Sequence, residues 1–506
     1  MNTTAKKKMP LPLAQAIEKL RANPNNIGVA IHLGGLFHDY GEHAAATALR
    51  NQIVAGIPHL VKNPAIDHNQ LIILEMNLYN AFVKRVETEE NVRACFQSWV
   101  GPFADLGRRF RDPGLPMPLQ VPTAEKPWRA AFFLHTEALL GHTDALIEVL
   151  RHRPAGPPWG RPMVVVWNGV NNKLEKVCAD LDVELLYLQT ESGFPPEKRM
   201  ERLLFMRRRF AEAGITHFVW VSGLACSQTA FAARMAPVQV MWTLKFHPYR
   251  LPEIDEYITY GGWSEDTREV HGETWKVVPL MIQQVSPQVP SETVAAERAK
   301  YARFDFLFGT LARTEKLNSP PFLDAVIRIL RDNPKAGYLW TGRERVEAIQ
   351  QRFEEAGVAD RCAFIGWVDT PLYARVLDVF LETFPFGCGI TAMQALEAGT
   401  PLLSYQAAET QYGMHFMRPL AANDAAAETI RGLLEPKDGS GPLLYPPDAD
   451  AYVALANRLA GEAVFREAVG RAGQDYYRNY LTDADRMGRR FFEVLAGAKK
   501  PEEQTA

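Results

Sequence analysis

Apolar positions follow two different periods along the chain, and the change between them separates a helical part from an α/β part. Between residues 11 and 111 apolar side chains recur at the spacing of a helix face, as in NQLIILEMNLYNAFVKRVETEENVRACFQSWV. From residue 130 onward short apolar runs alternate with helical stretches, which is typical of a parallel sheet flanked by helices. We therefore predict an all-α domain over residues 1–120, followed by α/β domains over 121–290 and 291–500.

The α/β part repeats its alternation on each side of a softer segment, VSPQVPSETVAAERAKYAR. Before it we expect strands at 130–134, 163–167, 185–188, 217–221 and 238–242, with helices such as 143–151 and 198–213. After it we expect strands at 304–308, 338–340, 362–365, 379–381 and 402–404, with helices at 321–331, 344–356 and 391–398. Two Rossmann-like, doubly wound domains facing a cleft would explain this pattern, with closing helices over 450–496.

Two features of the first 130 residues concern organisation only. The segment RDPGLPMPLQVPTAEKPW has five prolines, which predicts an extended linker. One tetratricopeptide-like hairpin is indicated by the spacing of Leu33, Gly34, Phe37, Gly41, Ala46 and Pro58. Because a solenoid needs about three such repeats, we favour plain helical packing over a peptide-binding groove.

Composition excludes several classes of function. Lys and Arg number 56 against 59 Asp and Glu in 506 residues, so the net charge of −3 gives no broad basic field for nucleic acid. The five cysteines form no C-x-x-C pair, which indicates neither a zinc site nor a disulfide framework. No run reaches the ~18 apolar residues of a membrane span. We expect a protein of the reduced cytoplasm.

The segment VFLETFPFGCGITAMQALEAGTPLLSY carries the clearest chemical signal. An apolar strand enters a loop with Gly387 and Gly389, and a helix is expected to open at Thr391. Glycines allow a close approach of the backbone, and the amides at a helix start favour an anion. We predict that the backbone from Gly387 through Cys388, Gly389 and Ile390 to Thr391 binds a phosphate.

A second loop adds two cations at the edge of the same predicted sheet. In FLFGTLARTEKLNSPP a strand is expected to end at Phe308, and Arg313 and Lys316 follow in a polar loop before a helix that begins at a proline. Ligands of α/β sheets bind at the carboxyl ends of the strands. Lys316 is therefore either a phosphate ligand or a solvated loop lysine.

Two segments resemble a known family. The order of parts in LETFPFGCGITAMQALEAGTP resembles the nucleotide-sugar half of GT-B glycosyltransferases, especially family 41, which holds O-GlcNAc transferases and bacterial cytoplasmic adhesin N-glycosyltransferases. The strand APVQV, followed by a loop and the turn IDEY, is similar to a second part of that family. The resemblance covers about residues 130–403, with gaps.

The resemblance implies a GT-B fold whose last helix returns to the first Rossmann-like domain. It also implies metal-independent, inverting transfer of a hexose or N-acetylhexosamine from a UDP-sugar, with no cofactor besides that donor substrate. The acceptor would be a protein side chain, docked with help from the N-terminal helices. In the family, the lysine matched by Lys316 binds the diphosphate and offsets the leaving group's charge, with Arg313 beside it.

The resemblance also places the nucleoside. Family members carry an acid on the helix after the glycine loop for the ribose hydroxyls, whereas this chain has Gln394; an amide can still bond a hydroxyl, and Glu397 lies one turn further on. The stretch that ends in CAFIGWV resembles the part that reads the base, with Gly366 and Trp367 at its turn. Trp367 either stacks on the base or packs at the rim.

Candidate acceptor-side groups come from the first α/β domain. In FFLHTEALLGHTDALIEVL, His135 follows a strand and His142 precedes a helix, and the family has a histidine near donor and acceptor here. Histidine suits proton transfer near neutral pH, although both could be structural polar groups; His142 matches the family better. Lys245 and His247 lie in a loop, TLKFHPYR, that is bulkier and more basic than family loops, which leaves the acceptor type open.

Three further interpretations stay open. The pairs Asp448/Asp450 and Asp483/Asp485 look like metal-binding D-x-D motifs, but each precedes a predicted helix, so we favour helix capping. Gly309, Arg313 and Lys316 also fit the G-x-x-x-R-x-x-K style of retaining family-4 enzymes, which act on glycans or lipids but need an acid at position 394. A third alternative is an inactive GT-B scaffold with a helical interaction domain, for which Gln394 is the direct hint.

Overall fold

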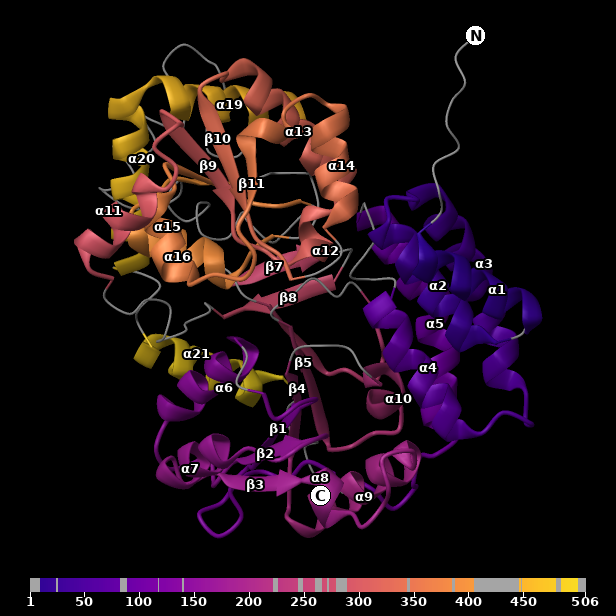
Figure 1. Cartoon of the computed structure of the whole chain (residues 1–506). Helices are drawn as coiled ribbons and strands as arrows, with labels where there is room; N and C mark the ends of the chain where they lie inside the picture. The colour runs from indigo at the N-terminus through magenta and orange to yellow at the C-terminus, as the bar shows by residue number, and fades with distance from the viewer. Residues whose placement is uncertain are drawn as a thin grey trace.

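The computed structural model shows two α/β lobes and a helical region beside them (Figure 1). The residues that it describes are 10–23, 26–81, 89–116, 118–138, 141–221, 226–243, 249–259, 266–270, 273–278, 289–343, 346–384, 387–404, 446, 448–478 and 484–498. Three residues from the sequence analysis lie outside the described residues: the candidate acceptor-side groups Lys245 and His247, and Asp483 of the second D-x-D pair.

The N-terminal region is helical, as predicted. Its elements are α1 (Leu11–Ala22), α2 (Ile27–Asp39), α3 (His43–Lys62), α4 (His68–Ala81) and α5 (Glu89–Arg108). The expected hairpin consists of α2 and α3, and Gly41 in its turn has φ +78°, a conformation that favours glycine. Pro58 lies inside α3.

The first lobe contains an eight-stranded sheet in the order β3-β2-β1-β4-β5-β6-β8-β7, parallel except for β7. Its strands are β1 (Ala130–Leu134), β2 (Met163–Val166), β3 (Glu184–Tyr187), β4 (His217–Val221), β5 (Val238–Trp242), β6 (Glu256–Thr259), β7 (Thr267–Val270) and β8 (Glu273–Val277). Its helices are α6 (Gly141–Arg151), α7 (Asn172–Asp180), α8 (Leu188–Glu191), α9 (Arg199–Glu212) and α10 (Ser227–Ala232).

The five strands predicted for this lobe are confirmed to within one residue, but the prediction stopped too early. The IDEY segment, expected as a turn, runs into β6, and the β7–β8 hairpin extends the sheet edge. These strands are short and mix polar with apolar residues, and β8 has one exposed position, so they lack the apolar runs that identify β1 to β5.

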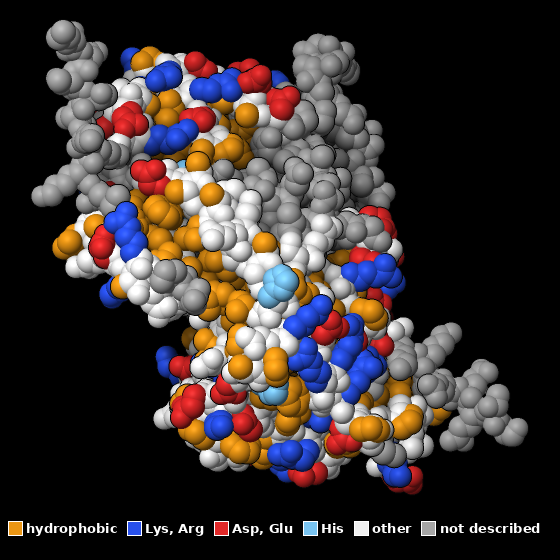
Figure 2. Space-filling view, turned by 90° about the vertical axis from the view of Figure 1, so that its right-hand side faces the viewer, with side chains coloured by type: hydrophobic (Ala, Val, Ile, Leu, Met, Phe, Trp, Pro, Cys, Tyr) orange, Lys and Arg blue, Asp and Glu red, His pale blue; other side chains and the backbone are white. Residues whose placement is uncertain are grey.

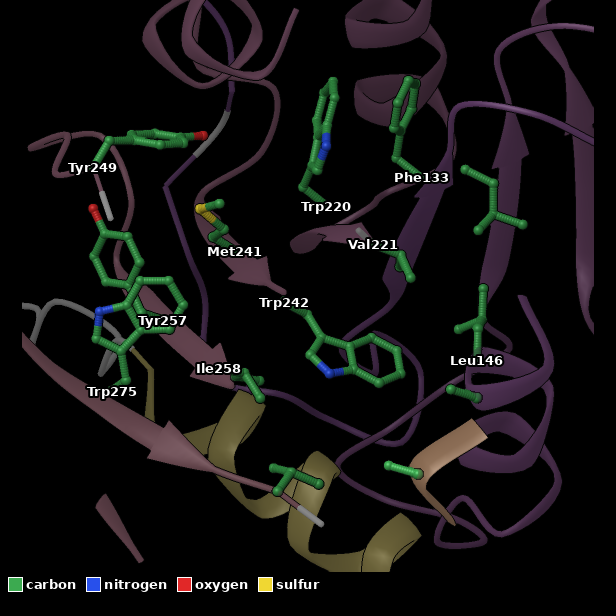
Figure 3. Packing of buried hydrophobic residues seen from close by; sticks show 14 of the residues in the cluster. Phe133, Leu146, Trp220, Val221, Met241, Trp242, Tyr249, Tyr257, Ile258 and Trp275 are labelled. Atoms are coloured by element: carbon green, nitrogen blue, oxygen red, sulfur yellow. The ribbon is translucent and has the colours of Figure 1, made fainter. Parts of the chain in front are cut away.

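Aromatic side chains fill the core of the first lobe (Figure 3). Phe133 of β1 stacks on Trp220 of β4 with ring centroids 4.2 Å apart, and Tyr257 of β6 lies against Trp275 of β8 at 5.0 Å. Strands β1, β2, β4 and β5 are buried along their whole length, because helices cover both faces of this sheet, whereas the edge strand β3 is buried only at its last two residues.

The second lobe has a five-stranded parallel sheet in the order β11-β10-β9-β12-β13. Its strands are β9 (Phe306–Thr310), β10 (Ala336–Trp340), β11 (Cys362–Phe364), β12 (Val379–Leu381) and β13 (Leu402–Leu403). Its helices are α11 (Ser291–Ala299), α12 (Thr314–Leu317), α13 (Pro320–Asp332), α14 (Glu347–Glu355), α15 (Thr370–Val376), α16 (Ile390–Ala398), α19 (Ala449–Gly461) and α20 (Ala463–Tyr476). The predicted alternation is confirmed, with β9 ending two residues later than expected.

The last helix, α21 (Ala484–Gly497), returns to the first lobe, as the family resemblance implied. The Phe491 ring lies 4.6 Å from that of Trp242 and 6.0 Å from that of Phe132. Asp485 Oδ1 is 2.6 Å from His152 Nδ1 at the end of α6. Helix α21 therefore belongs to the core of the lobe that begins the α/β part.

The helical region contacts both lobes. On the first lobe, the buried Glu75 carboxylate of α4 accepts hydrogen bonds from the Gln228 amide and the Thr229 hydroxyl at the start of α10. On the second, the Asn318 side chain donates to the His38 carbonyl of α2 at 3.0 Å.

Figure 2 shows basic and acidic side chains close together on the lower half of the face drawn there. None of the described helices is long and apolar enough to cross a bilayer.

Candidate functional site

Lys316 is presented by a short helix instead of the open polar loop that the sequence predicted. Strand β9 runs to Thr310, Arg313 occupies the N-cap position of α12, and Lys316 lies in its single turn. Prolines occupy the first positions of the next helix, α13, as expected. The two cations thus follow directly on the carboxyl end of the central strand.

The glycine loop lies after the neighbouring strand. Strand β12 pairs with β9 in parallel, so both loops leave the same edge of the sheet. Gly389 is the N-cap of α16, which begins at Ile390, one residue before the predicted start. Its φ of +59° favours glycine, and a methyl group built on it would meet no heavy atom within 4 Å among the described residues. As far as the described residues go, the backbone beside Gly389 is therefore open at a helix start.

Direct hydrogen bonds join the two loops. The Lys316 ammonium donates to the Gly387 carbonyl, and the Thr391 hydroxyl donates to the Leu311 carbonyl at 2.6 Å. A cation, open backbone and a helix start consequently lie at one place, which is the arrangement that binds phosphate groups.

The charges around Lys316 oppose one another. Burial lowers the pKa of Lys316, and Arg313 lowers it further, while Cys388, Glu382 and Glu315 raise it. Burial also raises the pKa of the Cys388 thiol to about 11, so this cysteine is a neutral group of the loop and not a nucleophile. An anionic ligand beside Lys316 would favour its charged form.

Glu382, which sequence reasoning missed, organises the glycine loop. It follows β12, is 1% exposed, and accepts hydrogen bonds from the Cys388 amide at 2.8 Å and the Ser404 hydroxyl at 2.6 Å. Burial raises its pKa. The signal in the sequence was the acid that ends the apolar run VFLE. An acid at the end of a strand is usually exposed to solvent, so its burial could not be predicted from this position.

This contact changes the expected role of Cys388. Its amide donates to Glu382 in this conformation and is therefore not available to a ligand. The hydroxyl of Thr391 is engaged with two carbonyl groups, those of Leu311 and Cys388.

Gln394 is buried on α16. It is 5% exposed, and its side-chain oxygen accepts no hydrogen bond from the described residues. A buried acceptor without a donor costs on the order of 1–3 kcal/mol, which a ligand hydroxyl would offset.

The expected base-reading turn lies at the same edge of the sheet. Gly342, which follows β10, donates its amide to the Gly366 carbonyl at 3.2 Å, and a methyl group on Gly342 would clash with the Thr314 hydroxyl of α12. Trp367 is 60% exposed, with the Arg343 guanidinium 4.0 Å from its ring centroid. Trp367 is therefore a surface ring and not a core residue.

The candidate histidines belong to the first lobe. His135 directly follows β1, and His142 lies in the first turn of α6. Helices α12 and α16 lie on the side of the second lobe that faces the first (Figure 1).

The D-x-D pairs have structural partners where they are described. Asp448 caps α19 by accepting the Ala451 amide at 2.8 Å, as predicted. Asp450 pairs with Arg328 at 2.7 Å, and Asp485 pairs with His152.

Comparison with solved structures identifies the fold. A mutant of the O-GlcNAc transferase of Thermobaculum terrenum aligns with 96% of this chain and 93% of its own, at 17% identity and a TM-score of 0.58. The chain has the GT-B fold. The fold predicted from the family 41 resemblance, with an all-α region ahead of two Rossmann-like units, is thereby confirmed.

Other GT-B-like matches are more distant. Anabaena HepE in complex with UDP and glucose has 13% identity and a TM-score of 0.49, and covers 73% of this chain and all of its own. A glycosyltransferase from Rickettsia africae has 11% identity and a TM-score of 0.48, and covers 74% of this chain and 98% of its own. Neither protein-family models nor curated protein sequences match the chain.

Proposed function

We propose that this protein is a metal-independent, inverting glycosyltransferase of the cytoplasm that moves a hexose or N-acetylhexosamine from a UDP-sugar to a protein side chain. The observation that carries the proposal is the meeting of Lys316 with the loop before α16, where Gly389 leaves the backbone open at a helix start. In a GT-B fold this site would belong to the pocket of a nucleotide-sugar donor.

Departure of a nucleoside diphosphate creates negative charge, which the Lys316 ammonium and the α16 amides would stabilise in place of a metal ion. Arg313 lies three residues earlier and would add a second positive charge. Gln394 would offer its unpaired oxygen to a ribose hydroxyl, and Trp367 would lie beside the base. His142 or His135 would assist the acceptor from the first lobe.

Protein acceptors are favoured over glycans and lipids by the first comparison, which includes the N-terminal helices as well as both lobes. Helices α2 and α5 contact different lobes and would offer a surface beside the acceptor side of the site. Here Gln394 also replaces the acid on which retaining family-4 enzymes depend.

Two measurements test the proposal. Calorimetry should detect UDP binding in the micromolar to low-millimolar range without added metal, and EDTA should leave the affinity unchanged. Intact-mass analysis of co-expressed candidate proteins should show additions of whole hexose or N-acetylhexosamine units. Absence of binding at millimolar UDP would refute the enzyme and favour an inactive scaffold; sugar transfer to glycans alone would refute the protein acceptor.

A further inference from the structure

One peptide unit of the glycine loop is held at both of its polar ends. The carbonyl of Gly387 accepts a hydrogen bond from Lys316, and the N–H of the same peptide, on Cys388, donates to Glu382 Oε1. The two partners carry opposite charge and follow neighbouring strands. Reversing this peptide would turn its carbonyl toward the carboxylate and its N–H toward the ammonium, so both contacts favour the present orientation.

Glu382 is itself fixed in place. Its second oxygen accepts the Ser404 hydroxyl, and its backbone carbonyl accepts the Tyr452 hydroxyl at 3.1 Å. Both Glu382 and Tyr452 are buried to 1% exposure or less. A buried carboxylate with both oxygens bonded has little freedom to move, and it transmits that rigidity to the Cys388 amide.

The charge of Glu382 also acts on Lys316. The groups that face the Lys316 ammonium are Arg313 and Glu315 from its own element and Glu382 and Cys388 from the β12–α16 connection. Of the two carboxylates, Glu382 is buried and Glu315 is partly exposed, so water screens the charge of Glu382 less.

We propose that Glu382 is a positioning residue of the diphosphate site, which fixes the Gly387–Cys388 peptide so that Lys316 and the amides from Gly389 onward are directed at the ligand. The inference rests on the proposed function. Glu382 would not touch the nucleotide; it would act through the peptide and through the charge state of Lys316.

The test compares UDP binding by calorimetry across pH 6.5–9.5 in the intact protein and in Glu382→Gln. We expect the variant to bind UDP about tenfold more weakly at pH 7.5, the worth of one charge-assisted hydrogen bond. Because removal of a negative neighbour lowers the pKa of Lys316, we also expect the alkaline loss of UDP affinity to begin at lower pH than in the wild type.

Glu75→Gln is the control for loss of a buried carboxyl group, because Glu75 also accepts a backbone amide and a hydroxyl, but in the helical region. Burial raises the pKa of Glu75 to about 8, so this control tests the loss of the hydrogen-bonding group and not of a negative charge. It should leave UDP affinity and its pH dependence unchanged. The inference is overturned if Glu382→Gln matches the wild type in both UDP affinity and its pH dependence, or if Glu75→Gln weakens UDP binding equally. It is also overturned if Glu382→Gln does not fold, because the carboxylate would then belong to the core of the lobe. Wild-type protein that binds no UDP would instead refute the proposed function itself.

Discussion

Single residues at the edge of the second sheet set what this site can do. Lys316 of α12 and Gly389 at the start of α16 are 73 residues apart in the chain. They lie close together because β9 and β12 are adjacent and parallel, and Lys316 reaches the Gly387 carbonyl. Each makes a different physical contribution: a positive charge in one case and a backbone conformation in the other.

Lys316→Ala should lower sugar transfer by about 10²–10³-fold, the size of effect seen when one donor to a developing anion is removed. The melting temperature should change little, because Lys316 has intermediate exposure and donates a single hydrogen bond among the described residues, to the Gly387 carbonyl at the edge of the lobe. Steady-state kinetics with a UDP-sugar measures the first and thermal unfolding the second.

The matched control for that variant is Lys335→Ala, since Lys335 is 83% exposed and pairs with Asp305 at the far end of β10. It should transfer sugar at the wild-type rate. Near-normal activity of Lys316→Ala would contradict the assignment of this lysine to the diphosphate.

Gly389→Ala should weaken UDP binding and destabilise the second lobe by about 1 kcal/mol, because alanine adopts a positive φ only at a cost although space for its methyl group is open. Gly101→Ala, at an exposed position in α5 with ordinary helix geometry, should be neutral or stabilising by up to ~1 kcal/mol. Denaturant unfolding and calorimetry with UDP separate the two effects. Equal behaviour of the two variants would show that the backbone at Gly389 carries no special conformation.

At the scale of elements, α21 ties the end of the chain to the lobe that begins the α/β part. Its buried face carries Met487, Phe491, Phe492 and Leu495, and the ring of Phe492 reaches Trp159 at 5.2 Å. The helix is amphipathic, so a partner was expected from its sequence. Which lobe supplied that partner followed only from the family resemblance.

Phe491→Ala should destabilise the first lobe by about 3–5 kcal/mol, because the ring is fully buried between Trp242 and Phe132 and its removal leaves a cavity. Val464→Ala, at an 80% exposed position in α20, should change stability by less than about 0.5 kcal/mol. Chemical unfolding followed by tryptophan fluorescence measures the change, since Trp159 and Trp242 of the first lobe lie beside the mutated helix. A small effect of Phe491→Ala would mean that α21 is only loosely attached.

At the scale of the whole molecule, buried histidines make stability depend on pH. The His217 ring is fully buried between Trp128 and Trp159, at 5.3 and 4.9 Å, and burial lowers its pKa to about 3. Burial likewise lowers the pKa of His43, near the contact of the helical region with the second lobe, to about 4. Both groups remain neutral in the folded protein while an unfolded histidine gains a proton below about pH 6.5.

His217→Phe should therefore reduce the acid sensitivity of folding. The contribution of His217 is fully present above pH 6.5 and is lost as pH falls toward 3, at up to about 1.4 kcal/mol per pH unit, because the unfolded chain binds the extra proton. Urea unfolding at pH 7 and pH 5 measures this: the free energy of unfolding should fall less between the two pH values in the variant than in the wild type. His59→Gln, at an exposed position of α3, should keep the wild-type dependence of unfolding free energy on pH. If His217→Phe also kept that dependence, His217 would not be a source of the acid sensitivity.

The sequence alone determined the elements that bury long apolar runs or show a clear period. Strands β1, β4, β5 and β12 were predicted with their observed bounds, since continuous apolar runs between polar turns leave few alternatives. The glycine loop and Lys316 could be singled out because backbone freedom and charge are properties of the residues themselves. Short polar strands such as β7 were not predicted, because pairing with β8 rather than their own composition stabilises them.

The tertiary structure alone decided which groups meet. That Lys316 bonds the Gly387 carbonyl and that Glu382 holds the Cys388 amide depend on strand order, and strand order follows from contacts between residues far apart in the chain. A local pattern carries no record of those contacts. The chemical identity of the site could therefore be proposed from the sequence, while its arrangement required the fold.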